Sequence, residues 1–121
     1  MSSWTHIVGC IRVDGIPTMG NRTSDISKAL GPMSTFEQSN DSCTLPCGSE
    51  GSLQYRVIEY DSGLPWIAVP IWGDLRDYDD VEGITTWWKD TLQKFPMLRD
   101  AVLRVRVEGK EPITLDDGVR T

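Results

Sequence analysis

Cysteine and histidine are scarce in this sequence. Among 121 residues there are three cysteines, Cys10, Cys43 and Cys47, and one histidine, His6. Three thiols are too few and odd in number for a disulfide scaffold, and the spacing leaves open whether Cys43 and Cys47 pair or stay as thiols. If residues 4–13 form a strand, His6 and Cys10 lie about 13 Å apart, too far to share a zinc ion. We therefore expect a reducing, cytoplasmic location, no metal and no cofactor.

Long apolar runs are also absent. No stretch approaches the roughly 18 apolar residues of a membrane-spanning helix. Residues 1–6 lack the basic and apolar regions of a signal peptide, so we expect a protein that is neither secreted nor membrane-embedded. Eighteen acidic residues exceed twelve basic ones, and the net charge of -6 repels DNA, RNA and anionic lipid. We expect no long nucleic acid and no membrane as a partner.

The motifs of common catalysts are missing as well. The sequence contains no recognisable serine or cysteine nucleophile motif, no Walker or dinucleotide fingerprint, and no pair of carboxylates at a telling spacing. This lack of motifs favours binding over catalysis.

The sequence does contain segments in which apolar and polar residues alternate, as is typical of β-strands. These segments are residues 4–13, 53–60, 66–72 and 101–108. Asp61-Ser62-Gly63 predicts a hairpin between the second and third segments, and Gly109-Lys110 predicts a turn into a short extra strand at 111–115. Pro70 would place the third segment at a sheet edge or at a bulge.

Two further segments have helical features. Thr23-Ser24-Asp25 offers capping side chains before a short helix that ends at Gly31 and Pro32. Residues 81–95 have apolar residues spaced three and four apart, which predicts an amphipathic helix with Trp88 in its buried stripe. We interpret the acidic segment 74–80 as a loop whose carboxylates cap this helix.

The order strand, helix, strand, strand, helix, strand predicts a ferredoxin-like βαββαβ fold. In this fold a four-stranded antiparallel sheet carries both helices on one face. We expect one domain over residues 1–121, with a long loop at 33–52 and a frayed tail at 116–121. Long loops of this kind are often functional.

The other face of such a sheet, called the open face below, is the strongest indication of function. Alternation sends large aromatic and basic side chains to it. The candidate ligand-binding residues on this face and beside it are Trp4, Arg12, Arg56, Trp66, Trp72, Arg76, Arg104 and Arg106. Aromatic rings stack on bases and arginines clamp phosphates or carboxylates, so this set predicts a small anionic, nucleotide-like ligand.

A second candidate lies in the loop before residue 53. The segment Leu45 to Ser52 contains two glycines and two serines, a composition that allows successive backbone N–H groups to form an anion-binding nest. Gly48 and Ser49 are its candidate residues. An ordinary tight loop is the alternative interpretation.

A four-stranded sheet of this topology with aromatic residues on its open face resembles, in outline, the RRM-type RNA-binding domains. The aromatic and glycine-containing octamer of that family is absent from residues 102–108, so the resemblance carries no RNA-binding function.

We also expect a homo-oligomer, and burial of this face between copies of the chain is compatible with ligand binding. The alternative function is contact with another protein and no small ligand, as in an interaction module or a phage-type accessory inhibitor.

Overall fold

The computed structural model of this chain describes residues 3–14, 23–31, 45–46, 48, 51–59, 66–78, 80–95 and 98–117, and gives side chains in the first helix from Ile26 onward. Among these residues there are two helices and six strands. The strands are β1 (Trp4–Asp14), β2 (Gln54–Tyr55), β3 (Ile58–Glu59), β4 (Trp66–Arg76), β5 (Leu98–Val107) and β6 (Ile113–Asp116). The helices are α1 (Thr23–Leu30) and α2 (Val81–Leu92).

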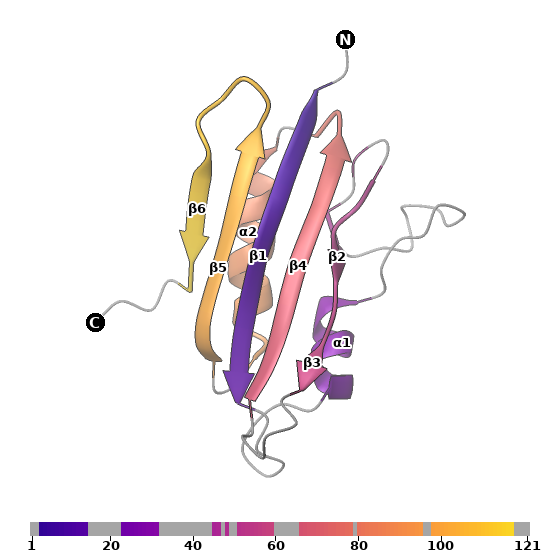
Figure 1. Cartoon of the computed structure of the whole chain (residues 1–121), viewed down its shortest axis with the longest axis vertical. Coiled ribbons are helices and arrows are strands. Elements are labelled where there is room, and N and C mark those ends of the chain that lie inside the picture. Colours follow the sequence, from indigo (N-terminus) through magenta and orange to yellow (C-terminus); the bar gives the residue numbers. More distant parts are fainter. Residues whose placement is uncertain are drawn as a thin grey trace.

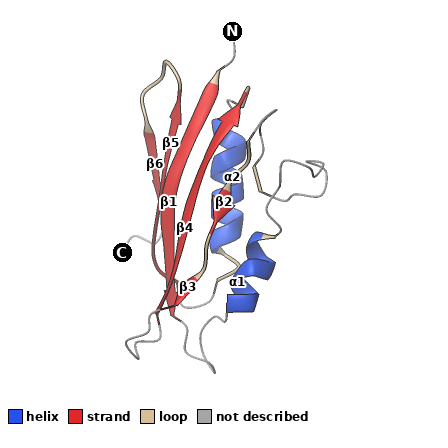
Figure 2. Ribbon diagram, turned by 45° about the vertical axis from the view of Figure 1, so that its right-hand side comes forward, coloured by secondary structure: helices blue, strands red, loops and turns tan. Residues whose placement is uncertain are grey.

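The strands form one antiparallel sheet (Figure 1). β1 lies between β4 and β5 and is antiparallel to both. β2 and β3 both pair with β4, while β6 pairs with β5. Both helices lie on the same face of the sheet (Figure 2). The open face is the one turned away from them.

The prediction of a four-stranded ferredoxin-like βαββαβ fold is wrong, because the sheet has six strands. The strand predicted at 53–60 is divided into β2 and β3, of two residues each. The short extra strand predicted at 111–115 is observed as β6. The helices have only eight and twelve residues, so the described chain is mostly β. Neither of these two helices is long and apolar enough to cross a membrane.

Pro70 explains why the second predicted strand is divided. The backbone N–H of Arg56 donates to the carbonyl oxygen of Pro70 at 3.2 Å. In a regular antiparallel pair, residue 70 would return a bond from its own N–H, and proline has none. The ladder between β4 and its neighbour is therefore interrupted at this pair. Pro70 itself stays in a strand that is paired on both sides, instead of at an edge.

The core lies between the helices and the inner face of the sheet. Ile26, Leu30, Ile84 and Trp88 are buried from the helical side, as the spacing in 81–95 predicts for Trp88. The strands contribute Ile7, Ile11, Val13, Ile67, Val69, Ile71, Leu75, Leu103 and Val105. Each large apolar side chain buried in this way contributes about 1.5–3 kcal/mol.

Polar contacts cap helix α2 and connect it to the sheet. Asp80 caps its N-terminus, where the carboxylate accepts the backbone N–H of Gly83 at 2.9 Å, so this part of the capping interpretation of segment 74–80 is confirmed. Trp88 Nε1 donates to the carbonyl oxygen of Asp116 at 2.7 Å and ties the helix to β6. The helix is thereby fixed against the β5 side of the sheet.

Gly9 allows β1 and β5 to approach closely in the middle of the sheet. A Cβ atom at this position would overlap the carbonyl oxygen of Val102 and lie 2.9 Å from Leu103 Cα. These obstacles are backbone atoms, which cannot move aside without disturbing the ladder.

We expect Gly9→Ala to lower the free energy of unfolding by about 2 kcal/mol or more, because the added methyl group overpacks this contact. Urea unfolding measures the loss. Gly109→Ala is the control: its Cβ would meet nothing within 4 Å and would cost only the strain of a positive φ, about 1 kcal/mol. Equal losses for the two variants would contradict the close approach.

Asp14 and Arg99 form an ion pair at the opposite end of β1 from Trp4. Arg99 Nε lies 2.8 Å from Asp14 Oδ1, and its Nη2 lies 2.7 Å from Oδ2. The Asp14 side chain is 1% exposed. Hydrogen bonds from Arg99 hold the pKa of the Asp14 carboxyl below its ordinary value. The pair fastens β1 to β5 beside the irregularity in their register at Arg12 and Val13.

We expect Asp14→Asn to lower Tm at pH 7, where the wild-type pair is complete. A lowered pKa means that the stabilisation is present above the unfolded-state value of about 3.9 and is lost as the pH falls through the folded-state value. The difference in Tm between wild type and variant should therefore shrink as the pH is lowered from 7 towards 2. Asp90→Asn, on an exposed side of α2, removes the same charge without this pair and is the control. A difference that is the same at both pH values would contradict this assignment.

Candidate functional site

The open face contains the side chains that alternation sends there. Along β1, β4 and β5 the buried residues alternate with exposed or half-buried ones, as predicted for most of their length. In an antiparallel pair, residues directly opposite each other share a face. The register therefore arranges the open face in rows that run across the three strands.

One row joins the single histidine of the sequence to an acidic and a basic residue. His6 of β1 stands opposite Asp74 of β4 on one side and Arg106 of β5 on the other. Neighbouring strands are about 4.8 Å apart, so the row brings together three titratable side chains that are distant in sequence. The loop prediction for 74–80 is wrong for Asp74 and Arg76, which belong to β4.

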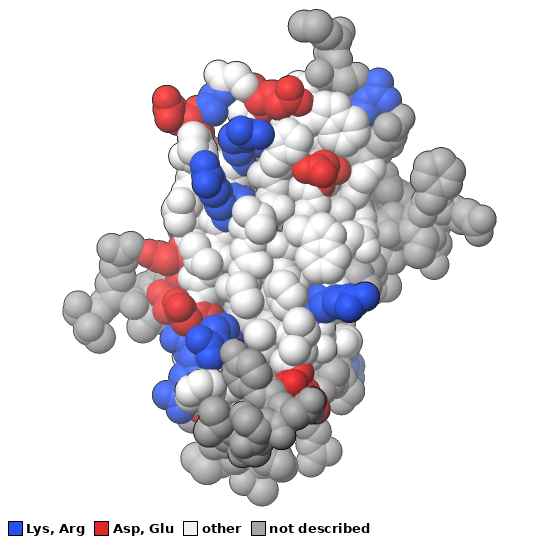
Figure 3. Space-filling view, in the orientation of Figure 1, with Lys and Arg blue, Asp and Glu red and all other residues white. Residues whose placement is uncertain are grey.

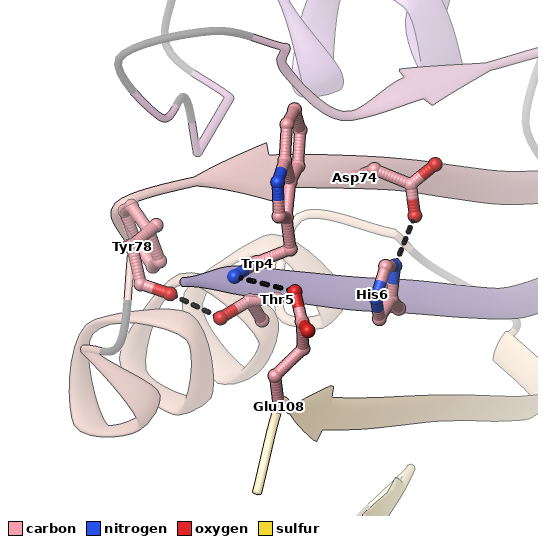
Figure 4. Close-up of polar contacts among 6 residues, drawn as sticks. All are labelled: Trp4, Thr5, His6, Asp74, Tyr78 and Glu108. Carbon is pink, nitrogen blue, oxygen red and sulfur yellow. Dashed lines mark hydrogen bonds and ion pairs between the residues drawn. The ribbon is translucent and has the colours of Figure 1, made fainter. Parts of the chain in front are cut away.

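His6 and Asp74 form a hydrogen-bonded pair at 2.6 Å between Nδ1 and Oδ1 (Figure 4). An ionised carboxylate can only accept, so the proton of this bond belongs to Nδ1 of His6. The two side chains are 36% and 66% exposed. Nε2 is thus the ring nitrogen that Asp74 leaves for other contacts.

The end of β1 that presents this pair is anchored on both sides (Figure 4). The hydroxyl of Thr5, a buried residue, donates to the carbonyl oxygen of Tyr78. The backbone N–H of Trp4 donates to Glu108 Oε1 at 2.9 Å. These contacts hold β1 against both neighbouring strands next to His6.

A hollow of about 350 Å³ lies over this row. It is lined by His6, Ile7, Val8, Asp74, Arg104 and Arg106. Figure 3 shows charged side chains towards both ends of the open face, while its middle is mostly uncharged. Within the described residues, neither Arg104 nor Arg106 forms an ion pair with a carboxylate, so their donors are available to a ligand.

The next row adds an aromatic ring beside the hollow. Val8 stands opposite Trp72 on β4 and Arg104 on β5. Trp72 is 43% exposed although it is a large aromatic residue. Its Cα lies about 10 Å from that of Arg104, since two strand spacings separate them. This row therefore combines a stacking surface with a cationic group.

Trp66 and Arg12, which were predicted in the same site, lie at the other end of the face. The Arg12 guanidinium lies 5.2 Å from the centre of the Trp66 ring, within cation–π range. Trp66 is six positions along β4 from Trp72, about 20 Å at the rise of a strand. One small ligand cannot contact both tryptophans.

The lining of the hollow does not include Trp4, Arg76 or Arg56. Trp4 pairs with Arg76 in the row beyond His6. Arg76 Nε lies 3.9 Å from Asp77 Oδ2. Arg56 is exposed at the interruption between β2 and β3. Trp4 and Arg76 are therefore next to the hollow, whereas Arg56, opposite Pro70, is farther from it.

The predicted anion nest is described only in part. The Gly48 N–H donates to the carbonyl oxygen of Gly51 at 2.9 Å, so this amide is engaged within its own turn. A Cβ at Gly48 would overlap the backbone of Arg76, which shows that the glycine allows close packing against β4. Ser49 lies outside the described residues.

Metal-binding and redox chemistry have little support within the part of the chain that the structure describes. No group of three His, Cys, Asp or Glu side chains there lies close enough to hold a metal ion. Cys10 is a free thiol on the open face, and its burial raises its pKa, which disfavours the thiolate. Cys43 and Cys47 lie outside the described residues.

Comparison with protein-family models, with curated proteins and with solved structures finds no match.

His6 and Asp74 were missed as a functional pair in the sequence. They are 68 positions apart, and alternation assigns His6 to the open face without giving its partner. Asp74 follows Trp72 by two positions, so alternation would place both side chains on the open face. The expectation that the strand ends at residue 72 excluded Asp74 from this face.

Proposed function

We propose that this chain is a non-enzymatic binding module for a small anionic, nucleotide-like ligand. The observation that carries the proposal is the hollow over His6, with Arg104 and Arg106 in its wall and the exposed Trp72 ring beside it.

The two arginines suit a phosphate or carboxylate group. They are two positions apart on β5, so both point to the open face with Cα atoms about 7 Å apart. Guanidinium groups bind such oxyanions through paired, charge-assisted hydrogen bonds. Arg104 and Arg106 are therefore placed to hold one anionic group between them.

Trp72 supplies a surface for the uncharged part of the ligand. Aromatic rings stack on nucleobases with about 1–3 kcal/mol per base. The separation of about 10 Å between Trp72 and Arg104 is of the order that allows a base on the ring and an anionic group at the arginines.

The net charge favours a small ligand over a long one, and the lining of the hollow favours binding without catalysis. The net charge of -6 opposes a long polyanion, while a single phosphate experiences mainly the local arginines. Among the described residues, the lining of the hollow contains no serine, threonine or cysteine that could act as a nucleophile. A cytoplasmic location forms part of the proposal, supported by the low cysteine content and the free Cys10 thiol.

Ligand binding is tested with AMP, ADP and inorganic phosphate by thermal shift and tryptophan fluorescence. We expect Arg104→Ala and Arg106→Ala each to weaken nucleotide binding about tenfold or more, because each removes a charge-assisted contact. Trp72→Ala should weaken AMP and leave inorganic phosphate unchanged.

Arg12→Ala and Trp66→Ala are the matched controls, since they remove the same residue types from the far end of the face. Both should leave binding unchanged. Failure of all three probes to bind, or an equal loss in the control variants, would contradict the proposed site.

A second candidate function is docking of a protein on the middle of the open face, either another copy of this chain or a protein that it inhibits, as a phage-type accessory protein would. The observation that favours it is a group of exposed apolar side chains. Val8 is 57% exposed, Ile58 46% and Val102 44%. Cys10, Ala68 and Pro70 lie between these three residues on the paired strands. Exposed patches of this kind mark interaction surfaces.

If two copies dock through this patch, Val102→Lys should abolish concentration-dependent association, because a buried lysine opposes the interface. Light scattering during size-exclusion chromatography over a range of concentrations measures the mass. Ile113→Lys is the control: Ile113 is 41% exposed but pairs with Val105, whose side chain faces the core. A monomer at all concentrations would exclude the homo-oligomer and leave only a different protein as the partner.

A further inference from the structure

The hydrogen bond between His6 and Asp74 has a consequence for which anion the hollow accepts. Asp74 takes the Nδ1 proton, so a neutral His6 presents a lone pair at Nε2. A lone pair repels an anionic oxygen, whereas the Nε2–H of an imidazolium donates to it. An anion that contacts Nε2 is therefore bound best when His6 carries a second proton.

The charges around His6 also determine how much negative charge on a ligand the hollow can balance. Three of them line the hollow together with His6: Asp74 from β4, and Arg104 and Arg106 from β5. Glu108 follows the end of β5, is not part of this lining and accepts the Trp4 N–H. The four side chains His6, Asp74, Arg104 and Arg106 carry one net positive charge with a neutral imidazole and two with an imidazolium.

Phosphate monoesters and diesters differ in their negative charge and in the number of free oxygens. A monoester carries about 1.5 to 2 negative charges at pH 7, and three of its oxygens are free to accept hydrogen bonds. A diester carries one charge. With His6 as an imidazolium, the net charge of the four side chains balances that of the monoester. The hollow then offers three donor groups, the two guanidinium groups and the His6 Nε2–H, to the three free oxygens of the phosphate.

We infer that the hollow selects a terminal phosphate monoester and that His6 takes up a proton when the ligand binds. This inference rests on the proposed function, since it names the ligand class of the same site. His6 acts as the selecting residue, and Asp74 is a positioning residue that fixes the ring and supplies a counter-charge to the imidazolium.

The test compares AMP with 3′,5′-cyclic AMP, which has the same base but a diester phosphate. Isothermal titration calorimetry at pH 7.5 in two buffers with different heats of ionisation gives both affinity and protons taken up. For the wild-type protein we expect AMP to bind about tenfold more tightly than cyclic AMP. AMP binding should be accompanied by proton uptake, and cyclic AMP binding by much less.

His6→Gln is the diagnostic variant, because the glutamine amide can still donate to Asp74 but cannot take up a proton at Nε2. We expect it to abolish proton uptake, to weaken AMP about tenfold and to change cyclic AMP by less than about twofold. Since His6 is a surface residue, the variant should fold, and its Tm verifies this.

The outcomes separate this inference from the function it rests on. Equal affinities for AMP and cyclic AMP without proton uptake, while Arg104→Ala still weakens both, would overturn the inference and leave the proposed function standing. Proton uptake that persists in His6→Gln would also overturn it. If AMP, cyclic AMP and inorganic phosphate all fail to bind, the proposed function falls and the inference with it.

Discussion

The pairing of β1 with β4 on one side and β5 on the other is the constraint on which the rest of the structure depends. Its residues from Trp4 to Asp14 are in register with β4 along the whole strand. A slip of one residue would exchange the two faces, so Ile7 and Ile11 would leave the core and His6 would enter it. Core burial therefore fixes the register, and the register in turn places His6 between Asp74 and Arg106.

Alternation and helical spacing predicted the main elements because each reflects burial along a single segment. Strand β1 was expected at 4–13 and is observed as Trp4–Asp14, and α2 was expected at 81–95 and is observed as Val81–Leu92. Parity also gave Arg104 and Arg106 their place on the open face, where both are exposed. These properties are local, and a sequence records them directly.

The parts that could not be predicted depend on how segments meet. The missing N–H of Pro70 could be recognised in the sequence, but its effect on the paired strand required knowing that Arg56 lies opposite. The ferredoxin-like prediction failed partly for this reason. His6 and Asp74 became a pair only through a register between distant strands, and Trp66 was separated from Trp72 only once the length of β4 was known.

Charge in this protein is arranged locally rather than uniformly. The chain is acidic overall, but its arginines on the sheet have different uses. Arg99 is bound to Asp14 and stabilises the end of β1, and Arg12 lies against the Trp66 ring. Arg104 and Arg106 line the hollow. The described part of the open face therefore presents a local cationic surface on a chain whose net charge is negative.

The core and the hollow both depend on the register of the strands at His6. This register is tested most directly by NMR in solution, through cross-strand nuclear Overhauser contacts of the His6 backbone. The structure predicts contacts from His6 to Asp74 on one side and to Arg106 on the other. Contacts from His6 to Gly73 or Leu75 as its directly opposed partner, in place of Asp74, would show a shifted register and contradict the account.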